Sequence, residues 1–186
     1  CQDTNFLTND RTILLQLSEK IKNSNLKFRM YIETRPEGIN EKSVQLLKDL
    51  NVDGIGMGIE LAAEDFREES LHRFASQKKT IDAFKILKEN GIKRTSYNVI
   101  GFPEQTEDSI LQTIKFNKTL NPDNITVAYY SPYDGTGQQK KGIETKNFDD
   151  YEFDADAALR SKSKSKHLSA SKLDYYKKNF VNLARS

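Results

Sequence analysis

The chain has 186 residues and a formal net charge of +2, with 29 basic and 27 acidic side chains. This length suits one domain with its own core, and the balanced charge gives no general affinity for nucleic acid. No apolar run approaches the 18 residues of a membrane span, and no signal peptide opens the chain. Because Cys1 is the single cysteine, it forms no internal disulfide and cannot alone make a zinc or iron–sulfur site, so we expect a cytoplasmic protein.

Strands and helices alternate along the first two thirds of the sequence. The apolar patterns predict five strands, at residues 1–6, 26–33, 52–60, 93–100 and 124–130. Helices are expected between them, with N-caps at Asn9 or Asp10, Asn40, Thr80 and Thr106, and a short helical stretch at 63–75. One βα unit every 30 residues or so is typical of parallel βαβ units.

Such a sheet could be arranged in two ways, as an open doubly wound sheet or as part of a (β/α) barrel. Central strands of a doubly wound sheet are usually apolar on both faces. Here Tyr31 and Glu33 share one face of a strand, and Met30 and Ile32 share the other. This one-sided polarity favours the partial barrel, with polar groups gathered at the carboxyl ends of the strands.

The run 54–60 alternates most cleanly. Its apolar side chains fall on one face, and its glycines, together with Glu60, fall on the other. A glycine face that ends in a carboxylate predicts room for a ligand inside the barrel.

The pattern stops after Tyr133. An acidic run at 149–156 and a Lys/Ser stretch at 161–171 follow, and Tyr176, Phe180 and Leu183 could line one side of a final helix. We interpret the basic stretch as a mobile linker, because no aromatic side chains for stacking alternate with its lysines.

Five short segments, each at the end of an expected strand, carry a resemblance to a known family. They are Gln-Asp-Thr-Asn-Phe at 2–6, Glu-Thr-Arg at 33–35, Gly-Ile-Glu at 58–60, Asn-Val-Ile-Gly-Phe-Pro at 98–103 and Ser-Pro-Tyr-Asp-Gly-Thr at 131–136. In this order and spacing they resemble the radical S-adenosylmethionine (SAM) enzymes, particularly the subgroup that often carries an N-terminal cobalamin-binding domain.

The resemblance implies a six-stranded partial (β/α) TIM-type barrel. Its first strand is followed by a CxxxCxxC loop that holds a 4Fe–4S cluster, and SAM bound there is cleaved reductively to a 5′-deoxyadenosyl radical. That first βα unit is absent here. The chain is therefore expected to hold strands two to six at 1–138, and an acidic then Lys/Ser-rich extension at 139–186.

The resemblance also implies a set of SAM-binding residues. The expected contacts are Asp3, Glu33, Glu60, Gln77, Asn98 and Tyr130. Glu33 and Glu60 could accept hydrogen bonds from the SAM ammonium and ribose diol. Gln77 departs from the family pattern, in which an arginine would pair with the SAM carboxylate, and Lys78 could substitute for it. Structural roles are the competing interpretation: Asp3 as a turn cap, Asn98 as a strand-end partner and Tyr130 as core.

The leading hypothesis is the SAM-binding portion of a radical SAM enzyme, a fragment that is inactive without the cluster-binding segment. An electron donor such as flavodoxin or ferredoxin, an unknown small-molecule substrate and possible use of cobalamin follow from it. Two alternatives stay open at this point. One is a non-catalytic binding module, and the other is an unrelated barrel enzyme that uses Glu33 and Glu60 as acid and base.

Overall fold

A computed structural model describes residues 3–131, 135, 140, 144 and 166–186 of the chain. Its strands are β1 (Met30–Glu33), β2 (Val52–Glu60), β3 (Lys93–Ile100) and β4 (Asn124–Tyr129). Its helices are α1 (Arg11–Lys22), α2 (Glu41–Asp49), α3 (Glu64–Leu71), α4 (Gln77–Glu89), α5 (Glu107–Leu120) and α7 (Ala170–Arg185), with short 3-10 turns η1 (Phe6–Thr8) and η2 (Pro36–Gly38).

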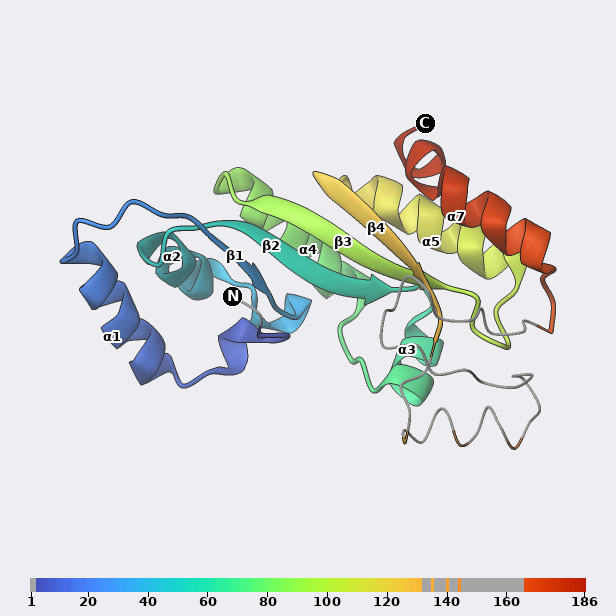
Figure 1. Cartoon of the computed structure of the whole chain (residues 1–186), viewed down its shortest axis with the longest axis horizontal. Helices are drawn as coiled ribbons and strands as arrows, with labels where there is room; N and C mark the ends of the chain where they lie inside the picture. The colour runs from blue at the N-terminus through green and yellow to red at the C-terminus, as the bar shows by residue number, and fades with distance from the viewer. Residues whose placement is uncertain (1–2, 132–134, 136–139, 141–143, 145–165) are drawn as a thin grey trace.

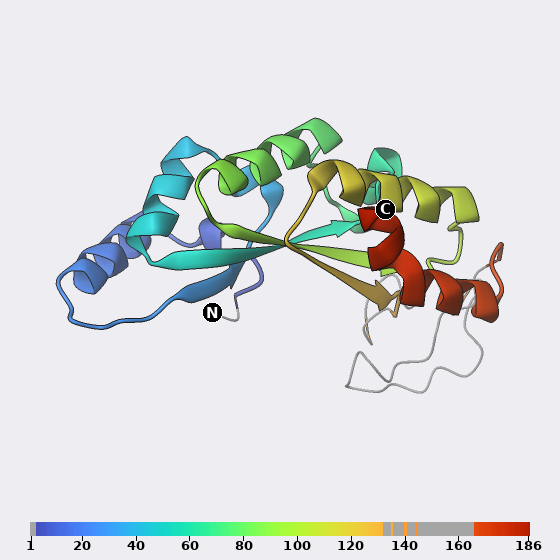
Figure 2. The same cartoon turned by 90° about the horizontal axis from the view of Figure 1, so that it is seen from above.

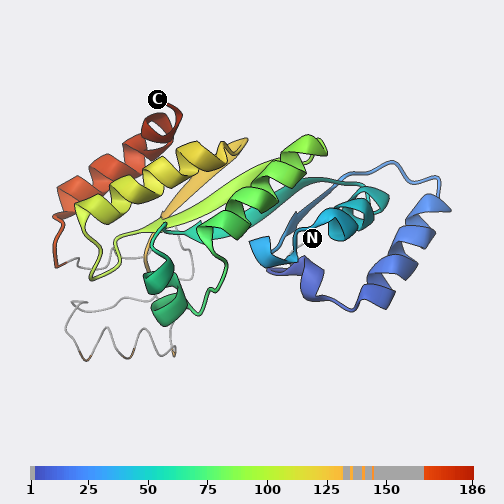
Figure 3. The ribbon, with the colours of Figure 1, turned by 180° about the vertical axis from the view of Figure 1, so that it is seen from behind.

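The four strands form one parallel sheet whose order follows the sequence, β1-β2-β3-β4 (Figure 1). Helices α2, α4 and α5 lie along one side of the fanned sheet, as seen from above in Figure 2 and from behind in Figure 3. The strand order never reverses, so the doubly wound alternative is wrong and the partial (β/α) barrel is confirmed.

The first predicted strand, at 1–6, is wrong over residues 3–6, the part that the structure describes. Residues 3–5 form a turn that leads into η1, and the next predicted strand is ordered as a ladder only at Met30–Glu33. Asp3 accepts hydrogen bonds from the backbone N–H of Asn5 at 3.0 Å and from the Asn9 side chain at 2.6 Å. Short polar side chains that bond the nearby backbone offer it an alternative to a ladder, and here that alternative prevails.

Helix caps at three of the four predicted sites are confirmed. Asp10, Asn40 and Thr106 accept hydrogen bonds from the first turns of α1, α2 and α5. Helix α4 instead begins one turn earlier than predicted. Its cap is Ser76, and the Thr80 hydroxyl donates back to the Ser76 carbonyl at 3.0 Å inside the helix.

Two apolar clusters hold the layers together. The larger lies among β1, β2 and helices α1, α2 and α4, and it contains the apolar face predicted for the run 54–60: Ile55, Met57 and Ile59. The smaller joins β3, β4, α5 and α7. Tyr176 and Phe180 of α7 are buried in it, so the predicted docking of a terminal helix is confirmed.

Other predictions for the tail fall on residues that the structure does not describe. The acidic run at 149–156, residues 161–165 of the Lys/Ser stretch and the proposed domain boundary at 138/139 lie outside the described residues. The described part of that stretch is ordered, contrary to the prediction of a mobile linker: Leu168 is buried and α7 begins at Ala170. Within the described ranges, no helix is long and apolar enough to cross a membrane.

Candidate functional site

The glycines of β2 do not leave the open space that the sequence predicted. A Cβ atom at Gly54 would lie 2.7 Å from Cδ2 of Tyr31, and one at Gly56 would lie 2.5 Å from Cε2 of Tyr97. Two tyrosine rings from the flanking strands therefore cover this part of the face. The prediction overlooked that a residue of a neighbouring strand can lean across a glycine.

Glu60 lies where β2 ends. Its φ of 61° is left-handed, and the ladder between β2 and β3 shifts register between Gly58 and Glu60. As a result the Glu60 carboxylate lies against Gly58, and a Cβ there would be 2.5 Å from Oε1. An L-residue in this conformation carries backbone strain, which is often found at functional sites.

Glu60 is paired with a cation. Nη2 of Arg73 lies 3.3 Å from its Oε1, and the Glu60 side chain is 16% exposed. Burial raises the pKa of Glu60, while the charges of Arg73 and Arg67 act to lower it.

Arg67 of α3 is the most unusual side chain of this region. It is only 3% exposed, and its Nε and Nη2 have no hydrogen-bond partner among the described residues. Burial lowers the pKa of its guanidinium, against the charges of Glu64, Glu37 and Glu60. We call Glu37, Glu60, Glu64, Arg67 and Arg73 the β2-end charge cluster. Leaving a buried donor without an acceptor costs about 1–3 kcal/mol of folding free energy. This guanidinium is therefore available to bind a group that is not part of the described chain.

Glu33 lies across β2 from Tyr97. Its neighbour in the ladder is Gly56, which the Tyr97 ring covers. The Tyr97 hydroxyl lies 3.0 Å from the hydroxyl of Tyr31. Burial, followed by this contact, raises the pKa of Tyr97 well above its usual range.

Gln77, at the start of α4, is turned onto the backbone. Its Nε2 donates to the carbonyl of Ala62 at 3.1 Å, and its own N–H bonds to the Glu64 carboxylate. The cations near the site come from Arg67 and Arg73 instead. The family pattern placed an arginine at the position of Gln77, and the sequence analysis missed Arg67 and Arg73. Both follow Glu60 closely in the chain, but no local pattern reveals that they lie beside it.

Asn98 lies on the opposite face of the sheet from Tyr97. It is 1% exposed, and the Asn117 amide of α5 donates to it at 2.7 Å. Although Asn98 is the ladder neighbour of Glu60, the left-handed backbone at Glu60 sends the two side chains apart. Asp3 is also held locally, and the hydrogen bonds from Asn9 and Asn5 lower its pKa. The structure therefore brings neither Asn98 nor Asp3 to the β2-end charge cluster.

Tyr130 belongs to an aromatic group just beyond β3 and β4. Its ring centroid is 4.4 Å from that of Phe102, which lies 5.1 Å from Phe66 of α3. Phe66 and Phe102 line a cavity of about 90 Å³ at the carboxyl ends of the strands. A flat, apolar ring system could stack there.

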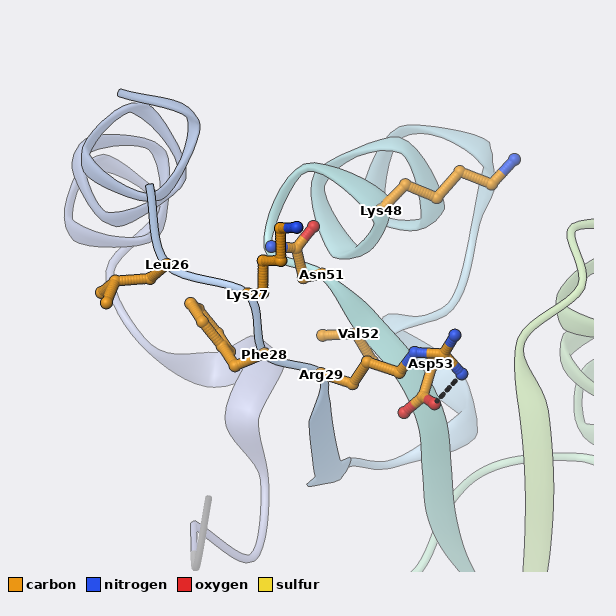
Figure 4. Close-up of a pocket in the computed structure, with 8 residues that line it drawn as sticks. All are labelled: Leu26, Lys27, Phe28, Arg29, Lys48, Asn51, Val52 and Asp53. Atoms are coloured by element: carbon orange, nitrogen blue, oxygen red, sulfur yellow. Dashed lines mark hydrogen bonds and ion pairs between the residues drawn. The ribbon is translucent and has the colours of Figure 1, made fainter. Parts of the chain in front are cut away.

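A larger groove lies at the opposite end of the sheet. It has a volume of about 610 Å³, and the residues that line it include Phe28, Lys48 and the ion pair of Arg29 with Asp53 at 3.3 Å (Figure 4). It is at the amino ends of β1 and β2, whereas sites of parallel sheets form at the carboxyl ends. We therefore place the candidate site at the β2-end charge cluster and not in this groove.

Comparison with known proteins shows the family of the chain. Residues 2–116 match the radical SAM superfamily. An uncharacterized methyltransferase of Pyrococcus horikoshii is 31% identical over 134 residues, which are 72% of this chain and 28% of that protein. The oxygen-independent coproporphyrinogen III oxidase of Helicobacter pylori is 25% identical over 64% of this chain and 26% of its own length. The chain thus spans about a quarter of the curated relatives that it matches.

Solved structures share the fold. Coproporphyrinogen III oxidase of Escherichia coli, described as a radical SAM enzyme, aligns with a TM-score of 0.67 and 20% identity over 95% of this chain and 37% of that one. The radical SAM methyltransferase TsrM of Kitasatospora setae, solved with cobalamin and a [4Fe-4S] cluster, aligns with a TM-score of 0.56 and 13% identity over 63% of this chain and 24% of that one. At these identities the likeness shows the partial TIM-type barrel alone.

Proposed function

Because the chain belongs to the radical SAM superfamily, we propose that it forms the SAM-binding wall of an enzyme that cleaves SAM reductively. The observation that carries this proposal is the β2-end charge cluster, in which Nε and Nη2 of the buried Arg67 have no acceptor among the described residues. Membership in this family also excludes the alternative of an unrelated barrel enzyme that uses Glu33 and Glu60 as acid and base.

The cluster suits a zwitterion. It combines two guanidinium groups with three carboxylates, so its formal charge is close to balanced and a simple anion gains little there. The amino-acid end of SAM carries an ammonium and a carboxylate side by side. Arg67 would donate to that carboxylate through Nε and Nη2, a fork that matches two carboxylate oxygens, and Glu60 would accept from the ammonium.

The remaining parts of SAM have candidate partners nearby. Glu33 has no cation within ion-pair distance among the described residues, so it is free to accept hydrogen bonds from the ribose diol. Phe102 and Tyr130 offer aromatic faces for the adenine. Contacts of Asp3, Gln77 and Asn98 with SAM stay predictions.

SAM, when bound beside a reduced 4Fe–4S cluster, supplies a 5′-deoxyadenosyl radical in this family. The residues of this chain do not fit the cluster itself, because Cys1 is its single cysteine. By itself the chain would therefore bind SAM without cleaving it, and the cluster ligands would come from another segment. The part that this chain plays is to bind and orient SAM.

The identity of the whole enzyme rests on further proposals. Cobalamin is present in TsrM, and a methyltransferase is among the relatives, which together favour a cobalamin-using enzyme. A flavodoxin or ferredoxin would supply electrons in a cytoplasmic setting, and the small-molecule substrate is unknown.

Calorimetric titration with SAM of the complete gene product that carries this chain tests the site. Glu60→Ala should weaken binding ten- to a hundredfold, since a hydrogen bond to a charged group contributes roughly 1.5–3 kcal/mol. Glu104→Ala is the matched control. Glu104 also lies beyond a strand end and pairs with a cation, Lys166, but its side chain is 55% exposed. Equal losses for the two variants would contradict the assignment.

Arg67→Met tests the guanidinium separately. Methionine keeps most of the length and apolar contact of the side chain and removes the donors. We expect weaker SAM binding and an unchanged or higher stability of the free protein, because unpaired buried donors disappear. Lower stability with unchanged SAM affinity would mean that Arg67 is held by the protein and not by the ligand.

A further inference from the structure

The segment 60–73 leaves the sheet at the end of β2 and carries most of the β2-end charge cluster. It holds Glu60, Glu64, Arg67 and Arg73, and its helix α3 lies just beyond the strand (Figure 1). The segment returns to its own start, because Nη2 of Arg73 lies 3.3 Å from Oε1 of Glu60. Its charged groups therefore keep their spacing only if the turn between β2 and α3 is fixed.

That turn has no local means of being fixed. The ladder between β2 and β3 ends at Glu60, and residues 61–63 are Leu-Ala-Ala, whose side chains offer no hydrogen-bonding group. Ala63, the N-cap of α3, makes no side-chain cap bond. Since Ala62 is only 3% exposed, its backbone N–H and C=O need partners from elsewhere in the chain.

Two helices supply these partners. Oγ1 of Thr113, on α5, accepts a hydrogen bond from the Ala62 N–H at 3.0 Å. Nε2 of Gln77, on α4, donates to the Ala62 carbonyl at 3.1 Å. Both backbone polar groups of Ala62 are thus held by side chains that lie 51 and 15 positions away in the sequence.

Thr113 is itself held in place. It is fully buried, and its hydroxyl donates to the Ser109 carbonyl at 2.8 Å, which leaves the oxygen lone pairs to accept from Ala62. One turn further along α5, Asn117 donates to the Thr113 carbonyl at 2.9 Å and to Oδ1 of Asn98 on β3 at 2.7 Å. The hydroxyl is therefore a fixed acceptor, tied to the sheet through buried polar side chains.

We propose that Thr113 is a positioning residue of the SAM-binding site, which anchors the turn at Ala62 and so fixes the β2-end charge cluster. This inference rests on the proposed function. Glu60 precedes the anchored residue by two positions, and Arg67 follows it by five. The two groups proposed to hold the ammonium and the carboxylate of SAM are therefore spaced by the anchored turn.

Affinity for SAM, in the complete gene product that carries this chain, is the first test. Thr113→Val keeps the shape of the side chain and removes the acceptor, so we expect about tenfold weaker binding. Thr113→Ser keeps the hydroxyl and should stay within about twofold of wild type.

Thr80→Val is the matched control for this measurement. Thr80 is equally buried, and its hydroxyl donates to the Ser76 carbonyl four residues earlier, but within the described ranges it accepts no bond from a backbone N–H. Its replacement should leave SAM affinity within about twofold of wild type. A loss with Thr80→Val as large as with Thr113→Val, or a tenfold loss with Thr113→Ser, would overturn the proposal.

A double-mutant cycle separates positioning from general support of the fold. In a Glu60→Ala background, Thr113→Val should cost no more than about threefold in SAM affinity, because one of the groups that it positions is gone. The same loss of about tenfold in both backgrounds would show that Thr113 acts on the fold alone and would overturn its positioning role.

A measurement without ligand keeps this test distinct from that of the proposed function. The carboxyl carbon of Glu60, followed by ¹³C NMR in the free protein, should shift in Thr113→Val, since the ion pair with Arg73 depends on the anchored turn. Thr80→Val should leave this resonance in place. If the wild-type protein fails to bind SAM, the proposed function is wrong, yet the Glu60 resonance still reports the anchor.

Gln77→Met provides the same measurement if Thr113→Val does not fold. It keeps the length of the side chain and removes the donor to the Ala62 carbonyl, so it should also shift the Glu60 resonance of the free protein. A Glu60 resonance that matches wild type in each of these two variants that folds would overturn the positioning role.

Discussion

The two edges of the sheet differ in how far the rest of the chain covers them. At the β4 edge, α7 covers the strand: Lys177 Nζ donates to the Val127 carbonyl at 2.6 Å, and the Tyr129 hydroxyl bonds to Asp174. At the β1 edge the ladder is only four residues long, and Leu26 and Phe28 before it are 69% and 37% exposed. One edge is closed by the chain itself, and the other is left accessible.

This difference shows that a partial barrel, which does not close on itself, must protect two edge strands. An unpaired strand edge presents free N–H and C=O groups and invites association with other chains. The β4 edge is protected by a helix that supplies both an apolar face and charged donors. Within the described ranges, the β1 edge is protected by its short length and by Lys27 and Arg29, which flank the exposed Phe28. Four substitutions, ordered from the largest expected effect, test this comparison.

Phe180→Ala should have the largest effect. Phe180 is fully buried between α7 and the sheet, and removing such a ring costs about 3–5 kcal/mol of unfolding free energy. Phe28→Ala at the other edge is the matched control, with an expected loss below about 1 kcal/mol. Denaturant unfolding of both variants measures the difference. Equal losses would show that the β1 edge is as well covered as the β4 edge.

Lys177→Met should have an intermediate effect. It removes a charged donor from the outer carbonyl of β4 and keeps the apolar stem, so we expect a loss of about 1–2 kcal/mol. Lys178, the next residue, is exposed and provides the control, for which no measurable change is expected. If both variants unfold like wild type, the helix protects the edge through its apolar contacts alone.

The contact between α7 and α5 should weaken in acid. Hydrogen bonds from Lys172 and then Tyr176 lower the pKa of Glu107 below its usual range. A lowered carboxylate pKa contributes stability above the unfolded value, and this contribution is lost as the pH falls through the folded value. The difference in Tm between wild type and Glu107→Gln should therefore shrink from about pH 6 to about pH 3. A difference that stays constant over this range would show that the Glu107 charge does not help to hold α7.

Leu26→Ser should have the smallest effect, within about 0.5 kcal/mol, because the side chain lies mainly in solvent. Denaturant unfolding at two protein concentrations provides the measurement. A loss above about 1 kcal/mol that depends on protein concentration would mean that a second copy covers the open edge in solution.

Local signals in the sequence predicted the alternating elements well. Asn40 and Thr106 cap helices as expected, because capping depends on residues only three positions apart. The start of α4 and the first strand were wrong. In both places a nearby polar side chain, of Ser76 in one case and Asp3 in the other, competes for the same backbone groups.

The candidate site was only partly predictable. Glu60 could be placed at a strand end from the sequence pattern, but Arg67 and Arg73 could not be placed beside it, since their position depends on how α3 turns back after the strand. Alternation within β3 places Asn98 on the face opposite Tyr97, but its separation from the Glu60 side chain depends on the left-handed backbone of Glu60 in the neighbouring strand, which no periodicity within β3 encodes.

By itself, the sequence determined that this is a parallel α/β chain with polar strand ends, and its strand-end motifs pointed to the radical SAM superfamily. Those features depend on the spacing of residues within single strands and helices. Only the tertiary structure decided that Tyr31 and Tyr97 cover Gly54 and Gly56 of β2, and that two donors of the buried Arg67 lack an acceptor in the part of the chain that the structure describes. Both depend on contacts between strands or between strand and helix, where the available space is set by neighbours distant in the sequence.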